Sequence, residues 1–153
     1  MHCKHRLLRT KTCFNRCLRE CYNARMTIII CLDDNNGYQF GGKRQSADRE
    51  VRNRILKLAP VIRCDEYTAS QFDEADRGRL YVGDDYLKTI NGTCFVEKAD
   101  VSGLKYDRLV VFRWNRSYPT TKKFVVPEGF RSVSKEDFPG YSHDRITMEV
   151  FVR

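Results

Sequence analysis

The chain has 153 residues, enough for one domain that buries an ordinary core without disulfides or a metal. A hydrophobic content of 41% and an aromatic content of 12% exclude a disordered chain. No apolar run approaches the roughly 18 residues that a membrane span needs, so no membrane partner is predicted. The net charge of +8 would by itself favour an anionic partner such as nucleic acid.

Most of that charge lies in residues 1–25, which hold seven basic residues and one acid and therefore carry +6, whereas residues 26–153 carry only +2. Nucleic acid is therefore an unlikely partner for residues 26–153. We interpret residues 1–25 as a basic, cysteine-rich leader outside the fold and residues 26–153 as a single α+β ligand-binding domain. Cys13, Cys17 and Cys21 share one helical face, which leaves metal ligation open, and the Arg-rich composition leaves a transit peptide open.

The first strand is predicted at 27–32, where three isoleucines precede a turn that begins at Asp33. A helix is predicted at 46–59, with Ser46 as its N-cap and Pro60 after its end. Further strands are predicted at 61–64, 80–82, 93–97, 107–115, 123–126, 130–133 and 145–153, with helical turns at 70–75 and 84–90. This order predicts one α+β domain with a mostly antiparallel sheet and about two helices.

The segment from Gly37 to Lys43 matches the G-x4-G-K part of a phosphate-binding loop. Arg44 stands where that loop needs a magnesium-binding hydroxyl, so a nucleotide triphosphatase is not predicted. Lys43 and Arg44 beside the start of a helix still predict an anion site. The alternative is a solvated polar loop.

Residues 26–153 contain a single histidine, His143, and no cluster with metal-ligand spacing. We therefore predict no metal, no cofactor and no catalytic residue, because a nucleophile lacks a histidine base unless His143 alone serves. His143 is expected in a polar turn before the last strand. On this basis we expect a protein that is not an enzyme.

The strongest strand, 107–115, alternates so that Phe112 and Trp114 lie on one face and Arg113 and Asn115 on the other. Guanidinium, amide and aromatic groups at one strand end are what a phosphorylated purine requires. The predicted ligand-binding residues are Lys43, Arg44, Phe95, Arg113, Trp114, Asn115, Arg116 and Arg131. The alternative is that the aromatic rings lie in the core and the arginines in solvent.

Five segments, 28–40, 43–46, 94–97, 114–119 and 142–147, together resemble small phage and gut Firmicute proteins that are often labelled ribonuclease Z. The label would require a histidine-rich metallo-β-lactamase site, which the sequence lacks. The resemblance covers residues 26–153 and is to the phage anti-Thoeris cyclic ADP-ribose sponge family.

That resemblance implies a non-enzymatic, cytoplasmic anti-defence protein that binds and sequesters the cyclic ADP-ribose signal made by bacterial TIR proteins. It also implies a homo-oligomer, a dimer or a trimer of dimers, and members that take cyclic oligonucleotides. Two other functions remain open. One is an RNA-binding protein or ribonuclease, motivated by the basic charge, and the other is a small protein-interaction module.

Overall fold

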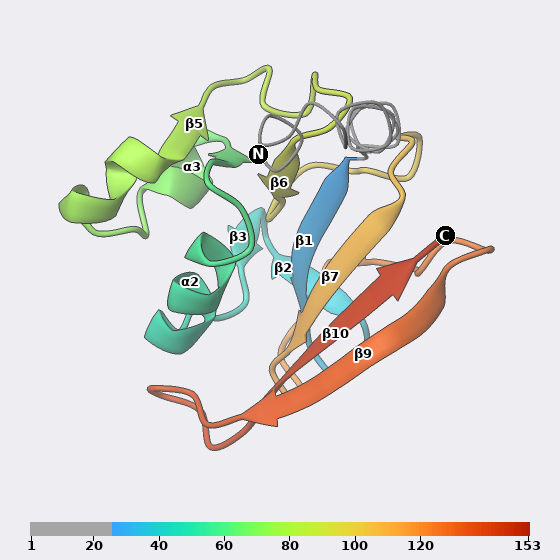
Figure 1. The fold of residues 1–153 in the computed structure, drawn as a ribbon. Helices are drawn as coiled ribbons and strands as arrows, with labels where there is room; N and C mark the ends of the chain where they lie inside the picture. The colour runs from blue at the N-terminus through green and yellow to red at the C-terminus, as the bar shows by residue number, and fades with distance from the viewer. Residues whose placement is uncertain (1–25) are drawn as a thin grey trace, which may run out of the picture.

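Figure 1 shows the computed structural model of the chain, which describes residues 26–153. The expectations for residues 1–25, namely a leader outside the fold, metal ligation or a transit peptide, lie outside the described residues. The described part contains a seven-stranded sheet, a three-stranded sheet and a few short helices.

The seven-stranded sheet contains, in spatial order, β5 (Leu80–Val82), β4 (Ile62–Cys64), β6 (Thr93–Phe95), β1 (Thr27–Leu32), β7 (Arg108–Arg113), β10 (Ile146–Val152) and β9 (Arg131–Phe138). The first five of these strands pair in parallel. Strand β1 lies between β6 and β7 and is covered on both faces, which explains why Ile28, Ile29 and Ile30 are all buried.

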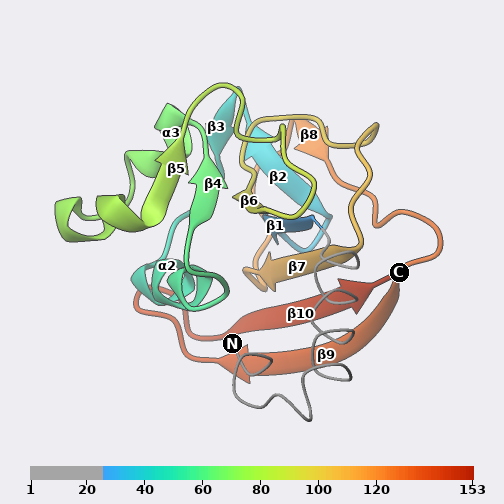
Figure 2. The same cartoon turned by 45° about the horizontal axis from the view of Figure 1, so that its top comes forward.

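Strand β10 runs antiparallel to β7 and to β9. Its register places Thr147 opposite Arg113 and opposite Asp137, and places Glu149 opposite Lys135. Side chains at these positions therefore share one face of the sheet. Figure 2 shows β9 and β10 as a long ribbon at one edge of the molecule, away from the short helices next to β4 and β5.

The three-stranded sheet contains β3 (Lys43–Arg44), β2 (Gly37–Phe40) and β8 (Lys122–Lys123), all antiparallel. Gly41 and Gly42 connect β2 to β3 with φ angles of 58° and 78°, and Phe40 pairs with Lys43. Two residues with positive φ between paired strands form the tight hairpin turn that glycine favours. The expected phosphate-binding loop is therefore a hairpin, and its Lys43 lies on a strand rather than at a helix start.

Helix α2 (Arg49–Leu56) begins after its N-cap Asp48, whose side chain accepts a hydrogen bond from the Glu50 N–H. The predicted cap, Ser46, lies two residues earlier. Two shorter helices follow, α3 (Glu66–Ala69) and the 3-10 helix η2 (Glu74–Arg79). The helical turn expected at 70–75 is thus displaced: α3 ends at Ala69, because Asp65 caps it early, and η2 begins at Glu74, within the expected range.

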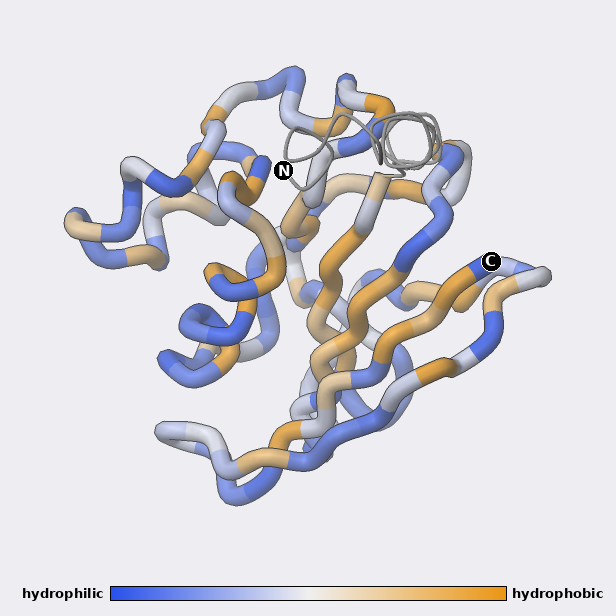
Figure 3. Tube along the Cα trace, viewed as in Figure 1, coloured by the Kyte–Doolittle hydropathy of each residue, from blue (hydrophilic) through white to orange (hydrophobic). Residues whose placement is uncertain are grey.

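Two groups of buried side chains fill the two faces of the seven-stranded sheet. On one face, Val51 and Ile55 of α2 pack with Val110 and Phe112. On the other face, side chains of β1 and β7 pack with Tyr38 of β2 and with loop residues. Figure 3 shows the hydrophobic residues concentrated along β1, β7 and β10, with a mostly hydrophilic β9 at the edge.

The predicted α+β class and single domain are confirmed for the described residues. Antiparallel pairing holds in the β7-β10-β9 part and in the small sheet, whereas the parallel run from β5 to β7 was not part of the prediction. The predicted alternation in β7 is also confirmed, because Val110 and Phe112 face α2 and Val111 faces the opposite core. Among residues 26–153, no helix has the length and apolar character to cross a membrane.

Candidate functional site

The carboxyl end of β7 carries three of the predicted binding residues, and the strand directs them to two faces. Trp114 continues the alternation toward α2 and is buried, with its backbone N–H bonded to the Leu32 carbonyl. Arg113 and Asn115 belong to the opposite face. Asn115 has a φ of 58°, a left-handed conformation that asparagine tolerates and that turns the chain away from the sheet.

Arg113 and Asn115 line a cavity of about 540 Å³ on the face of the sheet opposite α2. We call it the β7–β10–β9 cavity. It is lined by Arg113, Asn115, Lys135, Asp137, Arg145 and Thr147. Three of these side chains are cationic and one is anionic, and four of the six lie on β7, β10 or β9. The cavity therefore offers a positive, hydrogen-bonding surface.

Hydrogen bonds hold Asn115, Thr147 and Asp137 in place in this cavity. The Asn115 amide donates to Thr147 Oγ1 at 3.0 Å and to the Arg145 carbonyl at 3.2 Å, and Thr147 donates to Asp137 at 2.6 Å. The Thr147 hydroxyl lowers the pKa of Asp137, slight burial opposes this, and Arg145 adds to it. Arg145 meets Asp137 at 3.2 Å, but the side chains are 61% and 52% exposed, so this ion pair contributes little to stability.

Arg113 is held in the cavity by two neighbouring side chains. Its Nε and Nη2 contact Glu149 Oε1 at 3.0 Å, and its Nη1 lies 3.5 Å from Asn36 Oδ1. Glu149 is nearly buried, so this pair is desolvated more than the Arg145 pair. One carboxylate oxygen and one long contact leave the five-donor guanidinium with spare capacity. The arginine is thus positioned by the protein and still able to bind an anion.

The other predicted ligand-binding residues lie elsewhere. Arg44 belongs to β3, where it pairs with Glu97 at 2.9 Å and stacks on the Tyr67 ring at 4.2 Å, and Lys43 is exposed beside it. Their place on a hairpin removes the helix start from which the anion site was inferred. The hairpin does not bring them to the β7–β10–β9 cavity, since neither residue lines it.

Phe95, Arg116 and Arg131 are also outside the cavity. Phe95 is 2% exposed and packs edge-on against Phe72, so the core alternative holds for this ring. Arg116 is exposed in the loop after β7. Arg131 lies opposite Val152, five residues and about 17 Å along β10 from Thr147.

A second polar group lies on the α2 face and was not predicted. His143 is buried and its ring stacks on Trp114 with centroids 4.7 Å apart. Its Nδ1 lies 2.8 Å from Asp48 Oδ2, and its Nε2 lies 2.9 Å from Ser46 Oγ and 3.2 Å from the Tyr118 hydroxyl. We call Ser46, Asp48 and His143 the serine–histidine–aspartate group. His143 thus lies in a bend before β10, as predicted, but its side chain is buried.

Asp48 holds this group together by accepting five hydrogen bonds. The donors are the N–H groups of Glu50, Tyr141 and Ser142, the Ser142 hydroxyl and His143 Nδ1. Burial alone would raise the pKa of Asp48, but these donors outweigh it and lower the pKa far below its usual range. The carboxylate is thus charged, and it fixes the imidazole with Nδ1 as donor and Nε2 facing the hydroxyls.

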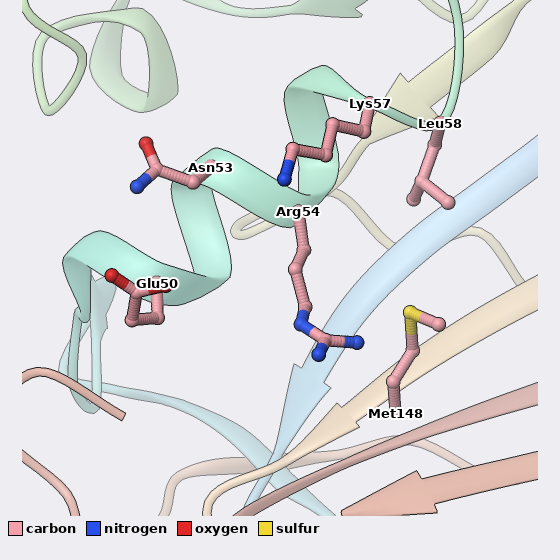
Figure 4. Close-up of a pocket in the computed structure, with 6 residues that line it drawn as sticks. All are labelled: Glu50, Asn53, Arg54, Lys57, Leu58 and Met148. Atoms are coloured by element: carbon pink, nitrogen blue, oxygen red, sulfur yellow. The ribbon is translucent and has the colours of Figure 1, made fainter. Parts of the chain in front are cut away.

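Two further cavities contain none of the predicted residues. Figure 4 shows the first, about 410 Å³, between α2 and Met148 of β10, with the Arg54 side chain pointing from the helix toward Met148. Arg54 also stacks on Phe138 at 3.8 Å and pairs with Glu136 at 2.9 Å, so it ties α2 to β9. The second, about 440 Å³, lies beside Tyr38, Tyr106 and Phe124. Within residues 26–153, no three His, Cys, Asp or Glu side chains gather to hold a metal ion.

Comparison with known proteins yields no match to any protein-family model and none to a curated protein. Among solved structures, the chain is similar to dihydrofolate reductase from Enterococcus faecalis complexed with NADP(H) and the compound RAB-propyl. The TM-score is 0.57 and the sequence identity 9%, over 85% of this chain and 96% of that chain. At this identity the likeness shows the fold alone.

This likeness corrects one expectation from the sequence. We expected a protein that is not an enzyme, because residues 26–153 offered a single histidine and no recognisable catalytic pattern. The finding contradicts that expectation, since the fold that the chain shares is used by an enzyme, a dihydrofolate reductase. Residue spacings in the sequence do not decide whether a chain is an enzyme, because a fold brings together residues that are distant in the sequence.

Proposed function

We propose that the β7–β10–β9 cavity binds a small phosphate-bearing molecule of the nucleotide class. One observation carries the proposal: Arg113, Lys135 and Arg145 converge with Asn115 and Thr147 around about 540 Å³. Cavities of roughly 300 to 1,000 Å³ with a few convergent polar groups are the usual size for small-molecule sites.

The charges favour phosphate over other ligands. A planar guanidinium can bind two oxygens of a phosphate at once, and Arg113 is already held in place by Glu149 at 3.0 Å. Arg145 and Lys135 are exposed, so a phosphate can draw their flexible side chains inward. The Arg145 pair with Asp137 is weak enough in water to be replaced by a stronger anion.

The lining also limits what is recognised. No aromatic ring lines the cavity, because Trp114 points to the other face of the sheet and Phe95 is buried in the core. Recognition therefore depends on phosphate and sugar oxygens more than on base stacking. The dihydrofolate reductase neighbour is a complex with NADP(H), a phosphorylated dinucleotide, which supports a ligand of this class.

The resemblance to the anti-Thoeris sponge family narrows the proposal to cyclic ADP-ribose-type signals, whose capture would counter bacterial anti-phage defence. The free thiols of Cys31, Cys64 and Cys94 support a reducing compartment, so we place the activity in the cytoplasm. The homo-oligomer implied by the resemblance stays a prediction, which light scattering after size-exclusion chromatography measures.

Isothermal titration tests the binding with cyclic ADP-ribose, ADP and inorganic phosphate. The double variant Lys135→Gln with Arg145→Gln removes two exposed cations from the cavity. Each charged hydrogen bond contributes about 1.5 to 3 kcal/mol, so we expect Kd to rise roughly tenfold or more. The melting temperature should hardly change, because both side chains lie at the surface.

The matched control is Arg108→Gln with Arg131→Gln, which removes the same charge from exposed positions at the other end of β7 and β9. It should leave Kd unchanged. Equal weakening by both double variants would mean that overall charge, and not the cavity, attracts the ligand. Tight binding of single-stranded RNA with a steep salt dependence, and none of the nucleotides, would instead favour an RNA-binding protein.

A further inference from the structure

We propose that Ser46, His143 and Asp48 form a nucleophilic site that cleaves small carboxylic esters, with Ser46 as the attacking group. This site is independent of the β7–β10–β9 cavity. It lies on the α2 face of the sheet, whereas the cavity lies on the opposite face. The buried Trp114 occupies the sheet position between them.

The distances satisfy the requirements of a nucleophile, a base and an orienting acid. Ser46 Oγ lies 2.9 Å from His143 Nε2, within reach for proton transfer. His143 Nδ1 lies 2.8 Å from Asp48 Oδ2 at the other side of the same ring. The two contacts use the two ring nitrogens in the way that the serine–histidine–aspartate arrangement requires on unrelated folds.

The three side chains also differ in solvent exposure in the way that a nucleophilic site requires. The side chains of His143 and Asp48 are 3% and 0% exposed, so water neither competes for the imidazole nor screens the carboxylate. Ser46 and Tyr118 are partly exposed. The nucleophile is therefore accessible to a substrate while its base and orienting acid remain enclosed.

The imidazole is held rigidly from two sides. Its face stacks on Trp114 at 4.7 Å, and its partner Asp48 is fixed by three backbone N–H groups. A base locked by packing and by a second layer of hydrogen bonds needs little reorganisation when the proton moves.

Tyr118 supplies the group that such a site needs for the developing negative charge. Nε2 of a neutral imidazole has one lone pair, but Ser46 and Tyr118 both direct a hydroxyl at it, from 2.9 and 3.2 Å. While Ser46 donates to Nε2, the Tyr118 hydroxyl is free to donate to another acceptor. A carbonyl oxygen attacked by Ser46 would lie within reach of that hydroxyl.

The reaction balances without a cofactor. Ser46 Oγ bonds to the acyl carbon while its proton moves to His143 Nε2, and the ester carbon–oxygen bond breaks as that proton passes to the leaving alkoxide. Water then attacks the acyl carbon, gives its proton through Nε2 to Ser46 Oγ, and releases the acid. The net change is ester plus water to acid plus alcohol.

The test is covalent labelling of the full chain with a fluorophosphonate probe, followed by peptide mass spectrometry. Ser46 Oγ should displace fluoride and carry the only label. Loss of the base in His143→Gln should slow labelling by roughly 100-fold or more, the usual contribution of a positioned base. Ser46→Ala should abolish the label and the hydrolysis of p-nitrophenyl acetate.

Ser70→Ala is the matched control. Ser70 is more exposed than Ser46, and its hydroxyl donates to the Tyr67 carbonyl and contacts neither His143 nor Asp48. Its removal should leave the labelling rate unchanged. Label on Ser142 or Tyr118, or no label on the wild-type chain, would overturn the proposal, and neither result depends on whether His143→Gln folds.

Discussion

The two faces at the end of β7 carry polar groups of opposite character. On the α2 face, Asp48 and His143 are buried and their hydrogen bonds are made within the protein. On the other face, Arg145 and Lys135 are exposed and Arg113 has donors to spare. The buried group thus stabilises the fold and has a fixed geometry, whereas the open group has hydrogen-bond donors that a ligand can use.

The largest difference in stability between the two faces should appear when Asp48 on the α2 face and Asp137 on the other face are each replaced by alanine. Asp48→Ala removes a helix N-cap and leaves three buried or partly buried backbone N–H groups without their acceptor. The lost cap bond from Glu50 costs about 1 kcal/mol, and each of the two other unsatisfied donors costs about 1 to 3 kcal/mol. We expect a total loss of about 4 kcal/mol in the free energy of unfolding, measured by urea denaturation.

Asp137→Ala is the counterpart on the open face. Asp137 is 52% exposed, and its partner Arg145 is 61% exposed and can turn to water. The expected loss is about 1 kcal/mol or less. Equal losses for the two variants would mean that the face near α2 is not the more tightly bonded one.

The sequence was sufficient to predict the elements on which both faces depend. The isoleucine run of β1 and the alternation of β7 are local patterns, so the buried strand and the opposite directions of Trp114 and Arg113 followed from them. The predicted strand 107–115 placed Arg113 and Asn115 on one face, and both line the cavity, although β7 ends at Arg113 and Asn115 has a φ of 58°.

The remaining features depend on long-range contacts that no local pattern contains. Asp48 and His143 are 95 residues apart in the chain, and they meet only because β10 returns beside β7. The parallel placement of β6 and β4 beside β1 also depends on how the connecting loops cross the sheet. One local signal was available: an aspartate two residues after Ser46, at the start of the predicted helix, is itself a good N-cap.

The two faces should also differ in how acid changes their contribution to stability. The pKa of Asp48 is lowered in the folded chain, because hydrogen bonds to the carboxylate outweigh its burial. Its contribution to stability is therefore complete above the usual aspartate pKa of about 3.9 and is lost as the pH falls below that value. The unfolding free energy of the wild type should drop between pH 5 and roughly pH 2.5.

Asp48→Asn sharpens this prediction, since asparagine also caps helices but does not titrate. The variant should be less stable than the wild type at pH 6 and should lose less stability on acidification. Asp137→Asn should lose nearly as much as the wild type, because Asp137 is exposed. Thermal melts across the pH range measure both, and identical acid slopes for Asp48→Asn and the wild type would assign the acid sensitivity to other carboxylates such as Asp33.

The smallest expected effect comes from a variant on the open face that releases Arg113 from its carboxylate partner. Glu149 holds Arg113 at 3.0 Å and is nearly buried, so Glu149→Gln keeps a hydrogen-bond acceptor while it removes the competing negative charge. We expect a loss of about 1 kcal/mol in unfolding free energy and a phosphate or nucleotide Kd that falls a few-fold. The affinity gain follows because an anion no longer has to share the guanidinium with a carboxylate. Lys135→Gln in the same background should reverse the gain, and an unchanged Kd in Glu149→Gln would mean that Arg113 takes no part in binding.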